Sequence, residues 1–383
     1  MAFLNFHRLQ PAIGYKFWNQ ELKCFTDFSE KKNLMFLKTH KCGTSTLVNM
    51  FYLFGLRRRL NFVLQSPHNH FITTKYIGDL VEPRPNSTWN LQVQHTIFDP
   101  DFQHKILPKN TTFYTTILRS PIRRFQSAFA YFGVENRKRK EYGDQLSYDE
   151  LVNRFLEEIK PPDDFTAPRM LYSNAHDLGW DQFEKNLDKG KSLNEKIDLF
   201  IKLIDSEMDF VMINDRFDES LVILKEYMCW NLTDMLYHSR LERRSKKNSF
   251  SDNLVIKKVQ DFNIIDEKLY AHFLSSFEKH IEKFGKDRIA SEVKRFQALK
   301  TILENTCYDF DSSKGTKKFS DYAKANFKIC EFLDGDDGLI ESILAELQSS
   351  NDYKISLNGT EKFAKSSFVN DILKSFEDSV IHY

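Results

Sequence analysis

The chain has 383 residues, of which 41% are hydrophobic and 28% charged, and its formal net charge is +1. This length suits one large α/β domain, or a domain with an appendage. A nearly neutral chain has no general attraction for nucleic acid or an anionic membrane, so any anion must bind at a local site. We therefore expect no nucleic-acid partner, and the oligomeric state stays open.

The cysteines and the glycosylation sequons bear on the cellular compartment of the protein. The five cysteines are Cys24, Cys42, Cys229, Cys307 and Cys330. None forms a CxxC pair, which favours neither a zinc site nor a dense disulfide framework and leaves one disulfide bond open. Glycosylation sequons occur at Asn86, Asn110, Asn231 and Asn358. They indicate a glycoprotein of the secretory pathway only weakly, because so short a motif is common by chance.

The first predicted unit is a strand over 33–37, a polar turn containing Gly43, and a helix over 46–54. The N–H groups that begin a helix are unpaired and lie at the positive end of its dipole, so this turn predicts an anion site. Gly43 allows close approach of the backbone, and Lys41 supplies a mobile cation. The candidate binding residues are Thr39, Lys41, Cys42, Gly43, Thr44, Ser45 and Thr46.

The order of residues in this turn separates two classes of anion loop. In nucleotide kinases the lysine follows the glycine, as in GxxxxGK[ST]. Here Lys41 precedes Gly43 and hydroxyl residues follow, a pattern that resembles the 5′-phosphosulfate loop of sulfotransferases. The alternative interpretation is a helix N-cap beside a solvated lysine.

The second unit is a strand over 112–118 and a helix over 122–132, which Pro121 opens in the manner of a first helical residue. Arg119 ends the strand, and Ser127 follows eight positions later, two turns into the helix. A guanidinium can grip phosphate with its planar fork, and a hydroxyl on the helix face adds another donor. This pair resembles the 3′-phosphate clamp of sulfotransferases.

Further along the chain the pattern continues with more helix. The capping box from Ser147 to Glu150 begins a helix over 147–159. A third strand over 209–213 precedes a helix over 218–230. Strands that alternate with helices predict an α/β fold with a mostly parallel sheet that helices cover on both faces.

The C-terminal part is predicted to be helical. A helix over 265–284 has one apolar face, residues 311–318 have the composition of a linker, and 339–347 and 363–380 resemble amphipathic helices. We therefore divide the chain into an N-terminal arm (1–30), a main domain (31–310) and a helical C-terminal tail (311–383).

Several segments together resemble the galactose-3-O-sulfotransferase family, which includes the galactosylceramide (cerebroside) sulfotransferases. The matching segments are 36–41, 112–121, 176–179, 217–222, 229–230 and 266–270. The resemblance implies the P-loop-containing nucleotide-binding fold of sulfotransferases. It also implies 3′-phosphoadenosine-5′-phosphosulfate (PAPS) as co-substrate without a metal, and the 3-hydroxyl of a terminal galactose on a glycolipid or glycan as acceptor.

The resemblance further implies an enzyme of the Golgi lumen with a type II membrane anchor. No run of about eighteen apolar residues occurs, so the chain as given is expected to be soluble. Two residues depart from the family pattern. Cys42 replaces a small or hydroxyl residue, which predicts the loss of one donor to the phosphosulfate, and His176 replaces a phenylalanine near the acceptor.

Sulfuryl transfer, like phosphoryl transfer, depends on positioning and on stabilising charge at peripheral oxygens. Lys41 is the candidate cation for the leaving phosphate. A base must take the acceptor proton, and histidine suits neutral pH. By resemblance, His95 is the first candidate base, and His40, which neighbours Lys41, is the second. The basic run 243–247 is either a loop over the nucleotide or a solvated face.

Two other functions fit the same fold, because one architecture serves many chemistries. A nucleotide-dependent kinase is disfavoured by the order of Lys41 and Gly43. A catalytically inactive glycan-binding relative is disfavoured by the presence of Lys41, Arg119 and Ser127.

Overall fold

The computed structural model describes residues 29–65, 71–73, 75–159, 170–238, 250–311 and 316–319, with Leu333, Ile340, Glu341, Leu344 and Gln348. Several predictions lie outside these residues. They are most of the N-terminal arm, the basic run 243–247, the sequon at Asn358 and the helix over 363–380.

The centre of the molecule is a parallel sheet of four strands in the order β3-β1-β5-β6. The strands are β1 (Leu34–Leu37), β3 (Leu91–Gln92), β5 (Phe113–Leu118) and β6 (Phe210–Ile213). In register, Leu37 pairs with Thr116 and Leu118 with Ile213. Every residue of these strands is buried, as expected for a parallel sheet covered on both faces. The α/β class and the three predicted strands are confirmed.

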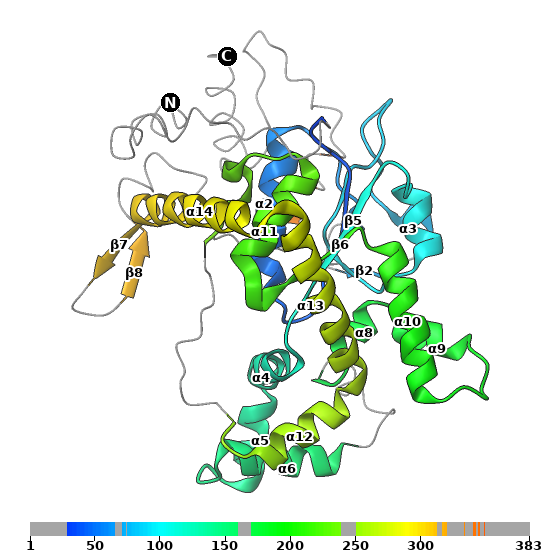
Figure 1. Ribbon diagram of the computed structural model, residues 1–383, viewed down its shortest axis with the longest axis vertical. Helices are drawn as coiled ribbons and strands as arrows, with labels where there is room; N and C mark the ends of the chain where they lie inside the picture. Colours follow the sequence, from blue (N-terminus) through cyan, green and yellow to red (C-terminus); the bar gives the residue numbers. More distant parts are fainter. Residues whose placement is uncertain are drawn as a thin grey trace.

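Helices flank the sheet (Figure 1). On one side lie α2 (Thr44–Arg57) and α11 (Phe217–Met228), and on the other α3 (Pro100–Ile106) and α10 (Leu193–Glu207). Two long helices, α13 (Ile264–Phe284) and α14 (Lys286–Cys307), follow one another, and α13 runs along the sheet. The helices expected over 46–54, 218–230 and 265–284 are therefore confirmed within a few residues at their ends.

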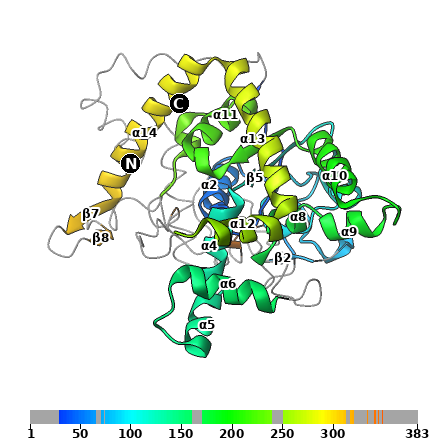
Figure 2. The same ribbon diagram turned by 60° about the horizontal axis from the view of Figure 1, so that its bottom comes forward.

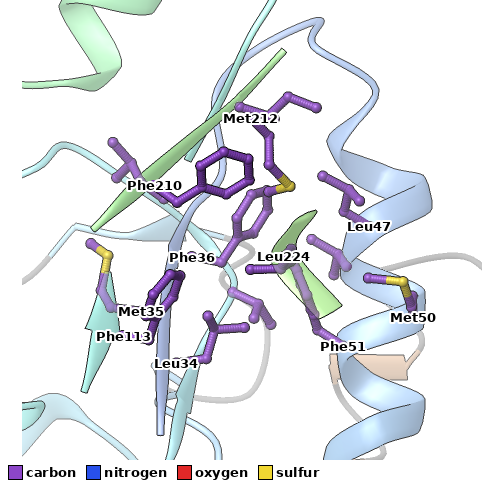
Figure 3. Packing of buried hydrophobic residues seen from close by; sticks show 14 of the residues in the cluster. Leu34, Met35, Phe36, Leu47, Met50, Phe51, Phe113, Phe210, Met212 and Leu224 are labelled. Carbon is purple, nitrogen blue, oxygen red and sulfur yellow. The ribbon is translucent and has the colours of Figure 1, made fainter. Parts of the chain in front are cut away.

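Phenylalanine fills much of the core between the sheet and α2 (Figure 3). Phe36 on β1 and Phe51 on α2 are fully buried, with ring centroids 5.0 Å apart. Phe210 and Met212 of β6 close the same cluster, as Figure 3 shows. Truncating such a ring to alanine costs about 3–5 kcal/mol of stability. This packing rigidly fixes the strands, and with them the loops at their carboxyl ends.

A helical lobe extends from the end of β5 (Figure 2). It contains α4 (Pro121–Tyr131), α5 (Val134–Tyr142), α6 (Tyr148–Glu158) and α12 (Asn253–Phe262), around their own apolar cluster. Pro121 is the first residue of α4, and the capping box of Ser147 and Glu150 begins α6, as predicted.

Shorter elements complete the fold. They are β2 (Phe71–Ile72), β4 (His95–Thr96), α8 (Ser173–Asp177), α9 (Trp180–Lys185) and the 3₁₀ helices Ile77–Asp79, Asn214–Arg216 and Leu232–Met235. Strands β2 and β4 pair in parallel, with Phe71 opposite His95.

The region predicted as a linker is partly strand. Strands β7 (Tyr308–Asp311) and β8 (Thr316–Phe319) form an antiparallel pair, so the prediction was wrong for Asp311 and for 316–318. Residues 312–315 lie outside the described part of the chain, and Tyr308, Phe310 and Phe319 are residue types that favour strands. In the C-terminal tail, Leu333, Ile340 and Leu344 belong to the main apolar cluster.

Cys229 and Cys307 are each disulfide-bonded, whereas Cys42 is a buried free thiol. No helix among the described residues is long and apolar enough to cross a membrane.

Candidate functional site

The loop between β1 and α2 is bent by two left-handed residues. Lys41 has φ 62° and Gly43 has φ 77°, a conformation that costs most residues free energy but suits glycine. A Cβ at Gly43 would lie 2.7 Å from Asn214 Nδ2, which itself donates a hydrogen bond of 3.0 Å to Cys42 O. The close approach of Asn214, from the end of β6, therefore requires glycine at position 43.

The hydroxyl groups of the loop divide into two kinds. Thr39 Oγ1 donates to Ile117 O at 2.6 Å, and Thr44 Oγ1 donates to Thr39 O at 3.1 Å; both residues are buried. Because a hydroxyl has one hydrogen, these two groups brace the loop and do not donate to an anion as they lie here. Ser45 and Thr46 are half-buried in the first turn of α2, where main-chain N–H groups have no helical acceptor. These hydroxyls and N–H groups remain the candidate donors for an anion.

Cys42 faces the protein interior. Its side chain is fully buried, and Sγ donates to Asn174 Oδ1 at 3.1 Å. Burial raises the pKa of Cys42 to about 12, so the thiol stays neutral. The replacement of a hydroxyl residue at this position therefore changes a contact with α8, and an anion in the loop would meet only the main chain of Cys42.

Arg119 joins the two predicted loops. It follows β5, the neighbour of β1, and its Nη1 donates to Lys41 O at 3.1 Å. Its Nε is buried and has no hydrogen-bond partner in the described part of the chain. Burial lowers the pKa of Arg119, but a guanidinium keeps its proton and its positive charge in a protein. A half-buried guanidinium with an orphaned N–H beside a helix N-terminus suits a phosphate, and Ser127 lies half-buried on α4, the helix that follows Arg119.

Two histidines stack beside this loop. The rings of His40 and His95 have centroids 4.3 Å apart and planes 20° apart. His40 Nδ1 lies 2.8 Å from Asp177 Oδ1, and His95 Nδ1 lies 2.9 Å from Lys38 O. Since a carboxylate and a carbonyl only accept, each Nδ1 carries a proton, and the neutral ring then has its lone pair on Nε2. The structure thus brings both predicted bases together.

Helix α8 organises the candidate site, and the sequence indicated a role only for its His176. Its Asp177 is buried and accepts from the main-chain N–H of His40 at 2.6 Å as well as from the ring. At the other end of α8, Asp266 accepts from the N–H groups of Asn174 and Ala175 at 3.1 and 2.8 Å. In the sequence, the segment 176–179 stands out only by its resemblance to the family. Nothing local in the sequence indicated which histidine Asp177 would contact.

Asp266 is itself held by a buried charge. Arg124 of α4 is fully buried, and its Nε lies 3.7 Å from Asp266 Oδ2. Burial raises the pKa of Asp266, and the positive charge of Arg124 opposes this shift. His176, the other departure from the family pattern, pairs with Asp181 of α9. No group of three or more His, Cys, Asp or Glu side chains in the described ranges is placed to hold a metal ion.

The chain resembles known proteins along most of its length. A family model described as galactose-3-O-sulfotransferase matches residues 14–323. The galactosylceramide sulfotransferase of Homo sapiens is 32% identical over 291 residues, which are 73% of this chain and 64% of that protein. The galactosylceramide sulfotransferase of Mus musculus is 29% identical over 303 residues, covering 76% of this chain and 68% of that protein.

A third relative, the galactose-3-O-sulfotransferase 3 of Mus musculus, is 26% identical over 285 residues, covering 71% of this chain and 62% of that protein. The chain thus spans a little less than two thirds of the length of the human and this murine relative. The resemblance inferred from the anion loop and the segments around it is confirmed. The chain belongs to the galactose-3-O-sulfotransferase family.

Proposed function

We propose that this protein is a sulfotransferase that moves the sulfuryl group of PAPS to a galactose hydroxyl, the 3-hydroxyl of a terminal galactose on a glycolipid or glycan. The observation that carries the proposal is the hydrogen bond from Arg119 to the carbonyl of Lys41, which joins the two candidate anion loops at the ends of adjacent strands. Family membership supports the reaction class, and the parallel sheet with its glycine turn supports a P-loop-containing sulfotransferase fold.

The residues present suit the sulfuryl donor. Lys41, the N–H groups that begin α2, Ser45 and Thr46 would hold the 5′-phosphosulfate. Arg119 and Ser127 would hold the 3′-phosphate, which other adenine nucleotides such as ATP lack. The donor set contains only nitrogen and hydroxyl groups, which suits an anion, and we propose that the reaction needs no metal.

We propose His40 as the base, with Asp177 as the carboxylate that orients it. A base whose ring is fixed by a buried carboxylate is the arrangement found where a hydroxyl must be activated. His95 donates to a main-chain carbonyl instead, and this contact is the reason for placing it second.

In the proposed step, the galactose oxygen attacks sulfur while its proton passes to Nε2 of His40. The bond between sulfur and the bridging oxygen breaks, and the electron pair leaves with the 5′-phosphate. The ammonium of Lys41 stabilises the negative charge that gathers there. The products are a galactose sulfate and 3′-phosphoadenosine 5′-phosphate.

The covalent chemistry of the chain supports a proposal for its compartment. Disulfide bonds at Cys229 and Cys307 suit an oxidising environment, and the sequons at Asn86, Asn110 and Asn231 suit the same secretory route. We propose the Golgi lumen, where galactosyl acceptors would be presented to the enzyme.

The direct test is to incubate the protein with PAPS carrying labelled sulfate and a panel of β-galactosides, including a galactosyl glycolipid and galactose-terminated glycans. Label should appear on galactose, with no requirement for Mg²⁺. Transfer of phosphate from ATP in the presence of Mg²⁺, without sulfuryl transfer, would establish the kinase alternative. Binding of galactosides with no transfer from any donor would establish the inactive glycan-binding alternative.

A further inference from the structure

Lys41 lies against an aromatic ring that the sequence did not connect with it. Its Nζ is 3.3 Å from the centroid of the Tyr131 ring. A cation within about 6 Å of a ring face is attracted by the negative face of the π-system. Tyr131 is the last residue of α4 and is 59% exposed, so packing in the core does not explain where its ring lies.

The backbone on both sides of this contact is fixed. Lys41 is held in the left-handed conformation, and its carbonyl accepts from Arg119. Helix α4 starts two residues after Arg119, beyond the carboxyl end of β5 (Figure 1). The loop that contains Lys41 follows the carboxyl end of the neighbouring strand β1. Within α4, Tyr131 lies four residues after Ser127, so the two side chains share one face of the helix. The helix face that offers Ser127 to the nucleotide therefore offers Tyr131 to Lys41.

The chemistry of lysine explains why such a contact matters. Its ammonium ends a flexible stem of four carbons and is strongly hydrated, so it has no preferred direction without a partner. A ring face restricts the stem and so gives the ammonium a fixed direction. We propose that Tyr131 is a positioning residue, whose ring holds the Lys41 ammonium on the side of the loop where the nucleotide would bind. This inference rests on the proposed sulfuryl transfer.

The test compares variants that keep or remove the ring. Tyr131→Phe keeps the ring face and should retain wild-type turnover, whereas Tyr131→Leu should lower kcat by about two- to fivefold, the worth of an exposed cation–π contact. The KM for the galactoside should change little, because Lys41 acts on the leaving group. Tyr142→Leu is the matched control: this ring in the same lobe contacts Lys138 and Arg154, and its loss should leave kcat unchanged.

A double-mutant cycle separates positioning from a structural role. If Tyr131 acts through Lys41, adding Tyr131→Leu to Lys41→Ala should lower the residual rate no further. An equal loss in both backgrounds, or a loss in Tyr131→Phe as large as in Tyr131→Leu, would overturn the inference. If the wild type is active and Tyr131→Leu matches it, only the role of Tyr131 is rejected. If the wild type transfers no sulfuryl group, the proposed function fails and the inference falls with it.

Discussion

Lys41 and its partner Arg119 are held by neighbouring strands, whereas the adjacent His40 depends on a carboxylate from a helix that is distant in sequence. Lys41 and Arg119 follow β1 and β5, which pair side by side, so their contact follows from the sheet. His40 and Asp177 are 137 residues apart in sequence. The contact between Lys41 and Arg119 is therefore a consequence of the sheet topology. The contact between His40 and Asp177 is a consequence of tertiary packing.

This difference teaches where each half is vulnerable. The half with Lys41 and Arg119, where we propose that the nucleotide binds (the nucleotide side), is supported by the core of the sheet. Substitution of the Lys41 side chain should change binding without moving the backbone. The histidine side is supported through α8 by Asp266 and Arg124, two fully buried charges. Removing one partner of a buried ion pair leaves the other charge buried without compensation, which commonly costs about 3–5 kcal/mol of stability. Tests of the histidine side therefore need substitutions at His40 and Asp177 and should leave this buried pair intact.

The largest expected effect is on the histidine side. His40→Ala should lower kcat by about 10²–10⁴-fold, the usual contribution of a general base, while affinity for 3′-phosphoadenosine 5′-phosphate stays near that of the wild type. Asp177→Asn should also lower kcat, because an amide no longer fixes the ring tautomer. Steady-state transfer to a β-galactoside and calorimetric titration of the nucleotide measure the two quantities.

His95→Ala is the control for this assignment. It removes the stacked ring but leaves the contact of His40 with Asp177, so its effect should be much smaller than that of His40→Ala. If His95→Ala abolishes transfer and His40→Ala retains it, the order suggested by the family resemblance is correct and our assignment is reversed.

On the nucleotide side, Lys41→Ala should lower turnover by about 10²–10³-fold, the range seen when one group that stabilises developing charge is lost. The fold should survive, since a half-buried loop lysine adds little stability. Turnover in single-turnover assays and the thermal midpoint are the measurements. A rate within about tenfold of the wild type, ~1.4 kcal/mol, would show that Lys41 is not the leaving-group cation.

The same contrast explains what could be predicted from the sequence. Strands β1, β5 and β6 and their following helices were predictable, because apolar runs and turn residues are local signals. Strand β3 has only two residues, and α14 has a weak apolar stripe, so neither was predicted. In the site, the meeting of Lys41 and Arg119 was predictable from two adjacent strands. The roles of Thr39 and Thr44 as internal braces, and of Asp177 as the partner of His40, depend on side-chain contacts that no spacing reveals.

A smaller effect should distinguish nucleotides. The product 3′-phosphoadenosine 5′-phosphate should raise the thermal midpoint more than AMP or ATP, because only the product carries the 3′-phosphate for Arg119 and Ser127. At one hundred times Kd, a ligand stabilises the native state by about 2.7 kcal/mol. Ser127→Ala should reduce the difference between the product and AMP. Arg123→Gln is the control, since Arg123 is exposed and pairs with Asp215. Equal shifts from all three nucleotides would reject the proposed clamp.

The smallest effect concerns Cys42, where the nucleotide side meets α8. Burial raises the pKa of this thiol to about 12, above the value of ~8.5 expected in an unfolded chain. The protonated thiol therefore stabilises the native state fully below pH ~8.5, and this contribution falls by up to ~1.4 kcal/mol per pH unit as the pH rises toward 12. Cys42→Ser, whose hydroxyl does not titrate there, can keep the bond to Asn174 Oδ1 and should lack this extra loss.

Urea unfolding of both proteins between pH 7 and 10 measures the difference, because all other titrating groups are common to the two chains. At pH 7 the two stabilities should be similar and sulfuryl transfer unchanged, since the side chain of Cys42 faces α8 and not the anion. A stability difference that stays constant with pH would show that the thiol is not sequestered in the folded protein. A loss of nucleotide affinity in Cys42→Ser at unchanged stability would show that the side chain of Cys42 contacts the bound anion. Cys42 would then be a binding residue and not only a residue that packs against α8.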